Sequence, residues 1–218
     1  MSDDYHEQFL KHRSIDPDIM LIRDCIADPA GFSEIRNPHP ELPVSAAVRR
    51  NARPSAVLVP IVDADDPTLI VTRRQQNIRF GGHVCFPGGL QDKHDISMVA
   101  TALRETYEEI NLAEEHIEVL GELGPYYTQA GFKIIPVVAL VKPGYLLRAN
   151  PHEVAEIYEI SMRKVLDASN YKLTWHTAGR GHYAYVEDDI RIAGPTVAVM
   201  IGLYEALLSF QASNPGNR

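Results

Sequence analysis

Residues 86–89 of this 218-residue chain read Phe-Pro-Gly-Gly, and residues 104–109 read Arg-Glu-Thr-Tyr-Glu-Glu. The first stretch predicts a tight glycine turn, and the second predicts a helix that carries one arginine and three carboxylates. A helix advances about 100° per residue, so the three glutamates share one arc while apolar side chains lie opposite. For the helix alone, a solvated acidic face is the simpler interpretation. The glycine turn at a fixed distance before it favours a cation site instead.

The chemistry of this cluster suits a hard divalent cation such as Mg²⁺ or Mn²⁺, which prefers carboxylate oxygens. We expect Glu105, Glu108 and Glu109 to be metal ligands and catalytic residues. A cation held there could neutralise a phosphate or diphosphate and activate a water molecule, whose proton a carboxylate would accept. Arg104 borders the same face, and we expect it to orient a carboxylate of the helix rather than to touch substrate.

The hydrophobic pattern predicts an α/β (α+β) sandwich with a mixed sheet, because strands occur on either side of a helix without a regular alternation. Strands are expected at 56–62, 69–73, 84–86, 117–123, 132–141, 154–160, 171–175 and 182–186. Helices are expected at 96–110, after an N-cap at Asp95, and at 162–166 and 196–210.

The chain divides into three parts by composition. Residues 1–50 are expected to form a helical arm and connector, with short helices at Phe9-Leu10 and near 19–22, followed by irregular structure over 31–54, where four prolines occur. Residues 51–213 are expected to form the catalytic domain, and residues 214–218 a tail. The arm and the apolar 196–210 helix suggest a homodimer, although burial within one subunit explains the helix equally well.

Composition narrows the class of protein. Charged residues at 23% and hydrophobic residues at 45% are ordinary for a soluble globular domain. The net charge of −8 argues against broad binding to nucleic acid. No apolar run is expected to reach the length of a membrane span, and the N-terminus lacks the features of a secretory signal. Cys25 and Cys85 are too few and too far apart for a disulfide framework, so a cytoplasmic location is expected.

The stretch from Gly89 to Leu112 resembles the signature box of the Nudix hydrolases, which cleave a nucleoside diphosphate linked to another moiety. Asp95 stands at the first glutamate position of that box, with one extra residue before Arg104. These differences resemble the coenzyme A pyrophosphatase subgroup. The residues that match it are Gly88, Gly89, Asp92, Asp95, Thr101, Ala102, Leu103, Arg104 and Glu105. Residues 69–74, 82–89, 135–138 and 151–154 also resemble subgroup segments, so the similarity covers roughly residues 50–170.

The resemblance implies a Nudix-type α/β/α sandwich and further roles for individual residues. The Gly88 carbonyl would add an oxygen ligand to the metal site. Arg73, Arg74 and Arg79, with Gly82 in the same motif, would bind the phosphates of coenzyme A. Each arginine could equally be a solvated surface residue.

Other residues have two interpretations. Glu153 is either a general base or late metal ligand, or an exposed residue before a strand. Tyr126, Tyr127 and Phe132 could stack on adenine, although core packing is their default role. Asp92 and Asp95 suit turn and cap positions.

The expected activity is metal-dependent hydrolysis of the diphosphate in coenzyme A or acyl-coenzyme A, which yields 4′-phosphopantetheine, or its acylated form, and 3′,5′-ADP. One alternative keeps the chemistry but takes ADP-ribose, NADH or a dinucleoside polyphosphate as substrate. Another is a non-catalytic regulator that binds a nucleotide on the same fold. The complete carboxylate set argues against the regulator.

Overall fold

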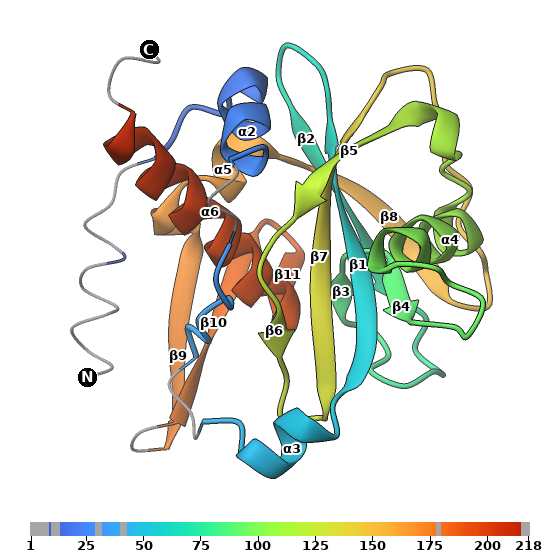
Figure 1. Ribbon diagram of the computed structural model, residues 1–218, viewed down its shortest axis with the longest axis vertical. Coiled ribbons are helices and arrows are strands. Elements are labelled where there is room, and N and C mark those ends of the chain that lie inside the picture. Colours follow the sequence, from blue (N-terminus) through green and yellow to red (C-terminus); the bar gives the residue numbers. More distant parts are fainter. Residues whose placement is uncertain (1–8, 10–13, 29–31, 40–42, 178–179, 215–218) are drawn as a thin grey trace.

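The computed structural model describes residue 9 and residues 14–28, 32–39, 43–177 and 180–214. Helices cover both faces of a mixed sheet, which confirms the predicted sandwich (Figure 1). The helices are α2 (Ile19–Ile26), α3 (Ala46–Arg50), α4 (Met98–Ile110), α5 (Met162–Val165) and α6 (Pro195–Ser213), with 3₁₀ helices at Glu114–His116 and Ala168–Asn170. The strands are β1 (Arg53–Val62), β2 (Thr68–Arg74), β3 (Val84–Cys85), β4 (Gly88–Leu90), β5 (Ile117–Glu122), β6 (Tyr126–Tyr127), β7 (Phe132–Val141), β8 (Val154–Ser161), β9 (Tyr171–Thr177), β10 (Arg180–Glu187) and β11 (Ile190–Ala193).

Strand β1 lies at the centre of the part of the sheet that carries the site. It runs parallel to β7 and antiparallel to β2 and β4, with Val57 opposite Gly88. Strand β2 also pairs with β3 and β8, and β5 and β6 pair with β7. Beyond β3 the order continues through β11 and β10 to β9. The glycine turn therefore lies against the central strand.

The alternation of side chains along β1 divides them between two cores, since residues two apart on a strand share a face. Leu58 packs in the core that contains Ala102 and Ile110 of α4. Val59 and Ile61 pack in the larger core, which includes much of α6. Each buried aliphatic side chain contributes about 1.5–3 kcal/mol to folding. This packing fixes α4, and the carboxylates on it, against one face of the sheet.

The start of α4 differs from the prediction. The helix begins at Met98, and the Ser97 hydroxyl caps it by accepting a hydrogen bond from the Ala100 N–H at 3.1 Å. Asp95 is therefore not the N-cap, because its carboxylate is bonded to Arg104 and Thr101 instead. At the other end Asn111 adopts a left-handed conformation, with φ of 57°, and so ends the helix in the manner of a C-terminal glycine.

Several short elements were not predicted. Helix α3 lies within the 31–54 stretch that was expected to be irregular, capped by Ser45. Strands β4, β6 and β11 have two to four residues, too few to show a periodic pattern. In the N-terminal arm, Phe9 is buried and helical, and the second expected helix is α2. Leu10 lies outside the described residues.

Helix α6 corrects the expectation that no apolar run reaches the length of a membrane span. Its 19 residues are long and apolar enough to cross a membrane by length and composition alone. Half of its most apolar window is buried within the protein, where the helix contacts α2, β6, β10 and β11. Its first twelve residues include buried side chains on all sides, so core packing explains the composition.

Candidate active site

Arg104 lies at the centre of a hydrogen-bonded cluster on α4. Its Nε and Nη2 donate to the two oxygens of Asp95 at 3.0 and 2.9 Å. Its Nη1 donates to Glu105 at 2.9 Å and to Glu108 at 3.1 Å, and Nη2 also donates to the Leu90 carbonyl at 3.2 Å. One guanidinium therefore ties the helix to β4 and to the turn between them. These are the contacts of a residue that positions carboxylates.

Asp95 is a fully satisfied carboxylate. Besides the two bonds from Arg104, its Oδ2 accepts from the Asp92 N–H at 2.8 Å and from the Thr101 hydroxyl at 2.9 Å. The hydrogen bonds from Arg104, followed by those from Asp92 and Thr101, hold the pKa of Asp95 well below its usual range. Asp92 shapes the same turn, since its Oδ1 accepts from the His94 N–H at 3.0 Å. The hydrogen bonds of both aspartates thus stabilise the turn before α4.

Glu109 has the opposite setting. Its side chain is 2% exposed, and its Oε2 has no hydrogen-bond partner among the described residues. The nearest cation is Arg74, whose Nη1 lies 3.7 Å from Glu109 Oε1. Burial raises the pKa of Glu109 to about 8; Arg74 and the Gly88 backbone oppose this rise, while Glu105 and Glu153 add to it. A buried carboxylate with an unused oxygen needs a proton or a cation.

The two glycines of the turn make room for these carboxylates. Gly88 has φ of 152°, and a Cβ there would lie 2.4 Å from the Ala56 carbonyl oxygen of β1. A Cβ on Gly89 would lie 2.4 Å from the carboxyl carbon of Glu105. A side chain at Gly88 would therefore meet the backbone of β1, whereas one at Gly89 would displace the Glu105 carboxylate. Burial raises the pKa of Glu105, and Arg104 opposes that rise.

Glu153 lies at the turn before β8 and approaches the same carboxylates. Its charge raises the pKa of both Glu105 and Glu109. The turn is held by Asn150, whose amide donates to Glu153 at 3.4 Å and whose backbone N–H donates to the Glu109 carbonyl at 2.8 Å. The structure thus brings Glu153 to the site. Asn150 was not predicted, because only the fold places it beside the end of α4.

The described residues contain no cluster of three or more His, Cys, Asp or Glu side chains arranged to hold a metal ion. Arg104 holds Glu105 and Glu108, while Glu109 faces Arg74. The donor chemistry nevertheless fits a hard cation. The candidate ligands are carboxylate oxygens. One of these oxygens, Oε2 of Glu109, is buried beside the glycine turn and has no hydrogen-bond partner among the described residues. Arg104 bonds to Oε1 of Glu105 and to Oε2 of Glu108, so the second oxygen of each carboxylate could bind a cation while the contact with Arg104 is kept.

The predicted phosphate-binding arginines are separated by the sheet. Arg73 and Arg74 are neighbours on β2, so their side chains point to opposite faces. Arg73 Nε donates to Glu156 at 2.8 Å and to the Tyr158 hydroxyl at 2.7 Å, whereas Arg74 faces Glu109. Arg79 lies in the β2–β3 loop, where its carbonyl accepts from Arg74 Nε at 3.3 Å. Gly82 has φ of 76°, which allows the loop to close on Arg74.

The aromatic residues considered for base stacking have different surroundings. Tyr126 is buried, and its hydroxyl donates to Asn37 at 3.2 Å. Tyr127 stacks against the guanidinium of Arg49, with 4.5 Å between Arg49 Cζ and the centroid of the Tyr127 ring. Phe132 is half-buried at the start of β7, opposite Arg53 of β1. Arg53 was not predicted from the sequence, because its place opposite Phe132 depends on the register of β1 and β7.

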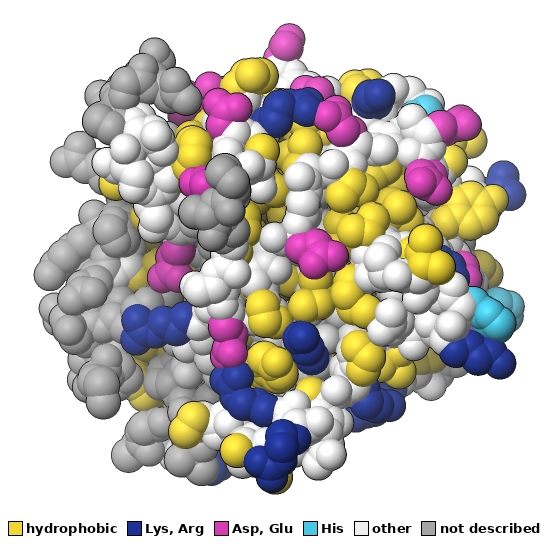
Figure 2. Space-filling view, in the orientation of Figure 1, with side chains coloured by type: hydrophobic (Ala, Val, Ile, Leu, Met, Phe, Trp, Pro, Cys, Tyr) yellow, Lys and Arg dark blue, Asp and Glu magenta, His cyan; other side chains and the backbone are white. Residues whose placement is uncertain are grey.

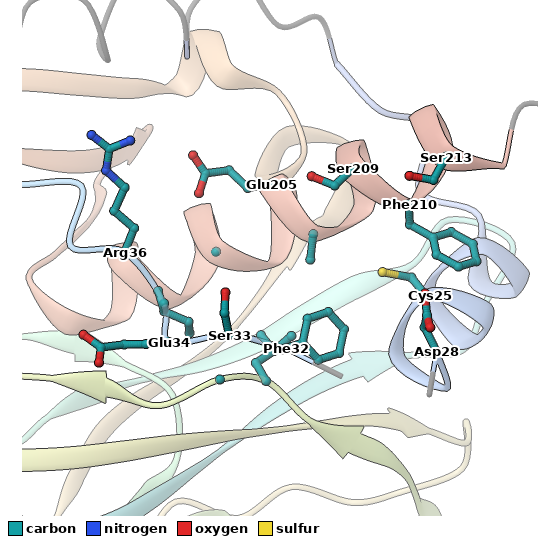
Figure 3. A pocket seen from close by; sticks show the side chains of 15 residues that line it. Cys25, Asp28, Phe32, Ser33, Glu34, Arg36, Glu205, Ser209, Phe210 and Ser213 are labelled. Atoms are coloured by element: carbon teal, nitrogen blue, oxygen red, sulfur yellow. The ribbon is translucent and has the colours of Figure 1, made fainter. Parts of the chain in front are cut away.

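A cavity of about 370 Å³ lies away from the carboxylates, between α2, residues 32–36 and α6 (Figure 3). Cys25, Phe32 and Phe210 provide apolar walls, and Ser209 and Ser213 line its α6 side. None of the residues of the carboxylate site lines this cavity. The cavity is therefore not part of the carboxylate site.

Comparison with known proteins gives an independent result for the same residues. The model of the NUDIX domain matches residues 52–178, more than half of the chain. An uncharacterized Nudix hydrolase, NudL, from Photorhabdus laumondii is 42% identical over 137 residues, which cover 62% of this chain and 73% of the relative. A NudL from Yersinia enterocolitica is 38% identical over 146 residues, covering 66% of this chain and 75% of the relative.

Among solved structures, a MutT/nudix family protein from Enterococcus faecalis matches with a TM-score of 0.49 and 16% identity, over 78% of this chain and 65% of that one. The matched NUDIX segment contains the glycine turn, α4 and Glu153. The predicted family resemblance is confirmed, and this chain belongs to the Nudix family.

Proposed function

We propose that this Nudix pyrophosphohydrolase cleaves the diphosphate of coenzyme A or of an acyl derivative. The products would be 4′-phosphopantetheine, or its acylated form, and 3′,5′-ADP. The observation that carries the proposal is the contact of Arg74 with Glu109. It brings the upstream segment that resembles a coenzyme A motif against the buried carboxylate of the Nudix box.

Mg²⁺ or Mn²⁺ would be held by Glu105, Glu108, Glu109 and the Gly88 carbonyl. When bound, the cation supplies neutralisation of the diphosphate and a lower pKa for the attacking water. Water attacks one phosphorus, the bond from that phosphorus to the bridging oxygen breaks, and the leaving phosphate takes the electron pair. A carboxylate accepts the proton of the water, and we assign this role to Glu153, whose charge acts on Glu105 and Glu109.

The arginines have separate parts in this proposal. Arg104 orients Glu105 and Glu108 through hydrogen bonds, and Asp95 in turn holds the Arg104 guanidinium. Arg74 offers positive charge to the diphosphate beside Glu109. Arg73 lies on the other face of β2 and is bonded to Glu156 and Tyr158, so it supports the sheet there.

The test is product analysis by mass spectrometry after incubation with Mg²⁺ or Mn²⁺. The substrates are coenzyme A, acetyl-coenzyme A, ADP-ribose, NADH and a dinucleoside polyphosphate. The proposal predicts 3′,5′-ADP and 4′-phosphopantetheine from coenzyme A in clear preference to the other reactions. AMP from ADP-ribose or NADH with coenzyme A intact would overturn the substrate assignment. Thermal stabilisation by coenzyme A without turnover of any substrate would instead indicate a binding protein.

A further inference from the structure

Two arginines, one at the start of β1 and one in the β2–β3 loop, face the same aromatic ring at the start of β7. The Cζ atom of Arg53 lies 4.5 Å from the centroid of Phe132, and that of Arg79 lies 5.4 Å from the same centroid. In the part of the chain that the structure describes, neither guanidinium forms an ion pair with Asp or Glu. Arginines that do form such pairs include Arg23, Arg49, Arg73, Arg74, Arg104 and Arg163. Figure 2 shows Lys and Arg side chains gathered at this edge, around α3.

The fold holds both arginines in place. Arg53 is paired with Phe132 in the parallel β1–β7 register, and its N–H donates to the Gly131 carbonyl at 2.9 Å. Arg79 also stacks on Phe80, with 4.8 Å between Cζ and the ring centroid. Phe80 has φ of 59°, a backbone conformation that is uncommon for a bulky residue and that often occurs at functional sites.

The group formed by Arg53, Arg79 and Phe132 is connected to the carboxylate site through Arg74. The Arg74 Nε donates to the Arg79 carbonyl at 3.3 Å, while its Nη1 lies 3.7 Å from Glu109. A single guanidinium thus touches both the loop that presents Arg79 and the buried carboxylate. The loop that presents Arg79 therefore adjoins the carboxylate site through Arg74.

Electrostatics indicates what would bind there. A ring attracts a cation through its negative face, but it offsets only part of the repulsion between two like charges. A phosphomonoester carries close to two negative charges at neutral pH, and guanidinium groups bind its oxygens through paired donors. The ring of Phe80, which is 49% exposed, lies beside Arg79 and offers a surface on which a base can stack.

We propose that Arg53 and Arg79, with Phe132 between them, form a subsite for a phosphomonoester on the nucleoside half of the substrate, separate from the diphosphate that is cleaved. The proposal rests on the proposed function, because in coenzyme A this group is the 3′-phosphate. The subsite makes the second phosphate a determinant of specificity. Substrates that lack it, such as ADP-ribose and NADH, would lose this interaction.

The test compares coenzyme A with dephospho-coenzyme A in the parent protein and in the Arg53→Gln and Arg79→Gln variants. Each variant should raise KM for coenzyme A by about tenfold with kcat retained, and leave KM for dephospho-coenzyme A unchanged. Arg50→Gln is the matched control, since it removes one exposed arginine of α3 that stacks on no ring among the residues that the structure describes. It should leave both KM values unchanged.

A parent protein that does not distinguish the two substrates would overturn the subsite, and so would variants that lose both equally. A binding measurement separates this result from a failure of the proposed function. By isothermal titration calorimetry, 3′,5′-ADP should bind about tenfold more tightly than 5′-AMP, and Arg53→Gln should abolish the difference. That outcome without hydrolysis of coenzyme A would retain the subsite and remove the activity. Equal binding of both nucleotides, or inorganic phosphate alone binding as tightly as 3′,5′-ADP, would remove the subsite.

Discussion

Asp95, before the start of α4, and Glu109, in its last turn, both have carboxylates with little solvent exposure, 6% and 2%, but they differ in their hydrogen bonds. Asp95 accepts four hydrogen bonds, two of them from Arg104. Glu109 keeps one oxygen without a partner in the described residues and lies 3.7 Å from its nearest cation. A carboxylate whose oxygens are all hydrogen-bonded, such as Asp95, stabilises a turn. A buried carboxylate oxygen without a partner, such as Glu109 Oε2, can bind a proton or a metal ion. The difference distinguishes a structural carboxylate from a functional one.

The largest effect is expected from Glu109→Gln. The substitution keeps the shape and removes the charge, so kcat should fall by about a hundredfold or more while the protein stays folded. The thermal midpoint at pH 8 should be unchanged or higher, since a buried charge is lost. Steady-state kinetics and thermal unfolding measure the two quantities. Glu115→Gln, on an exposed residue outside the site, is the matched control.

The glycine turn gives the next largest effect. Gly89→Ala should lower kcat by roughly tenfold to a hundredfold, because its Cβ would displace the Glu105 carboxylate. The fold should be retained, since the displaced atoms end a flexible side chain. Gly88→Ala should instead destabilise the protein, because its Cβ meets the backbone of β1 and its φ is unfavourable for alanine. Equal loss of stability in both variants would contradict this account of the turn.

Asp95→Asn tests the structural half of the comparison. Loss of the charge-assisted pair with Arg104, which is 31% exposed, should lower the free energy of unfolding by about 2 kcal/mol. Activity should fall less than in Glu109→Gln, because Glu105 and Glu108 still bond to Arg104. Chemical denaturation measures the first effect. A variant with wild-type stability and no turnover would reverse the roles given to the two carboxylates.

The pH dependence of stability tests the Glu109 half of the comparison without a change of sequence. Glu109 keeps its proton in the folded protein up to its pKa of about 8, whereas the unfolded chain loses it near 4.5. The folded state therefore binds more protons between these values, and without metal its contribution to the free energy of unfolding falls as pH rises through this range. Added Mg²⁺ binds the ionised form, so its stabilising effect should grow with pH.

Thermal unfolding from pH 5 to pH 9, with and without Mg²⁺, measures this dependence. The Glu109→Gln variant should lose most of the decline and of the metal effect, and the raised pKa of Glu105 accounts for what remains. A decline of the same size in that variant would assign the titration to another group.

Local pattern was sufficient for the framework of the site. The apolar run of β7 predicted its bounds, Phe132–Val141, and the strand and helix that flank the glycine turn were found from alternation and helical spacing. The predicted N-cap of α4 was wrong because Ser97 and Asp95 both suit that position. Arg104, nine residues further along, removes Asp95 from that role.

The missing parts of the site depend on tertiary contacts. A helical projection places Glu109 with Glu105 and Glu108. It contains no information on the contacts that Glu109 makes with the Gly88 backbone and with Arg74. The separation of Arg73 from Arg74 follows from the two-residue period of a strand and could have been predicted. The pairing of Arg53 with Phe132 joins positions far apart in sequence, which only strand register reveals.

Direct measurement of Mn²⁺ binding by electron paramagnetic resonance tests the central claim that Glu109 is the functional carboxylate of the pair. The wild-type protein, Glu109→Gln and Asp95→Asn would be titrated at one pH, each with its folding checked by circular dichroism. The account predicts that Glu109→Gln loses at least about tenfold in Mn²⁺ affinity and that Asp95→Asn stays within a few-fold of wild type. Wild-type affinity in folded Glu109→Gln would contradict it.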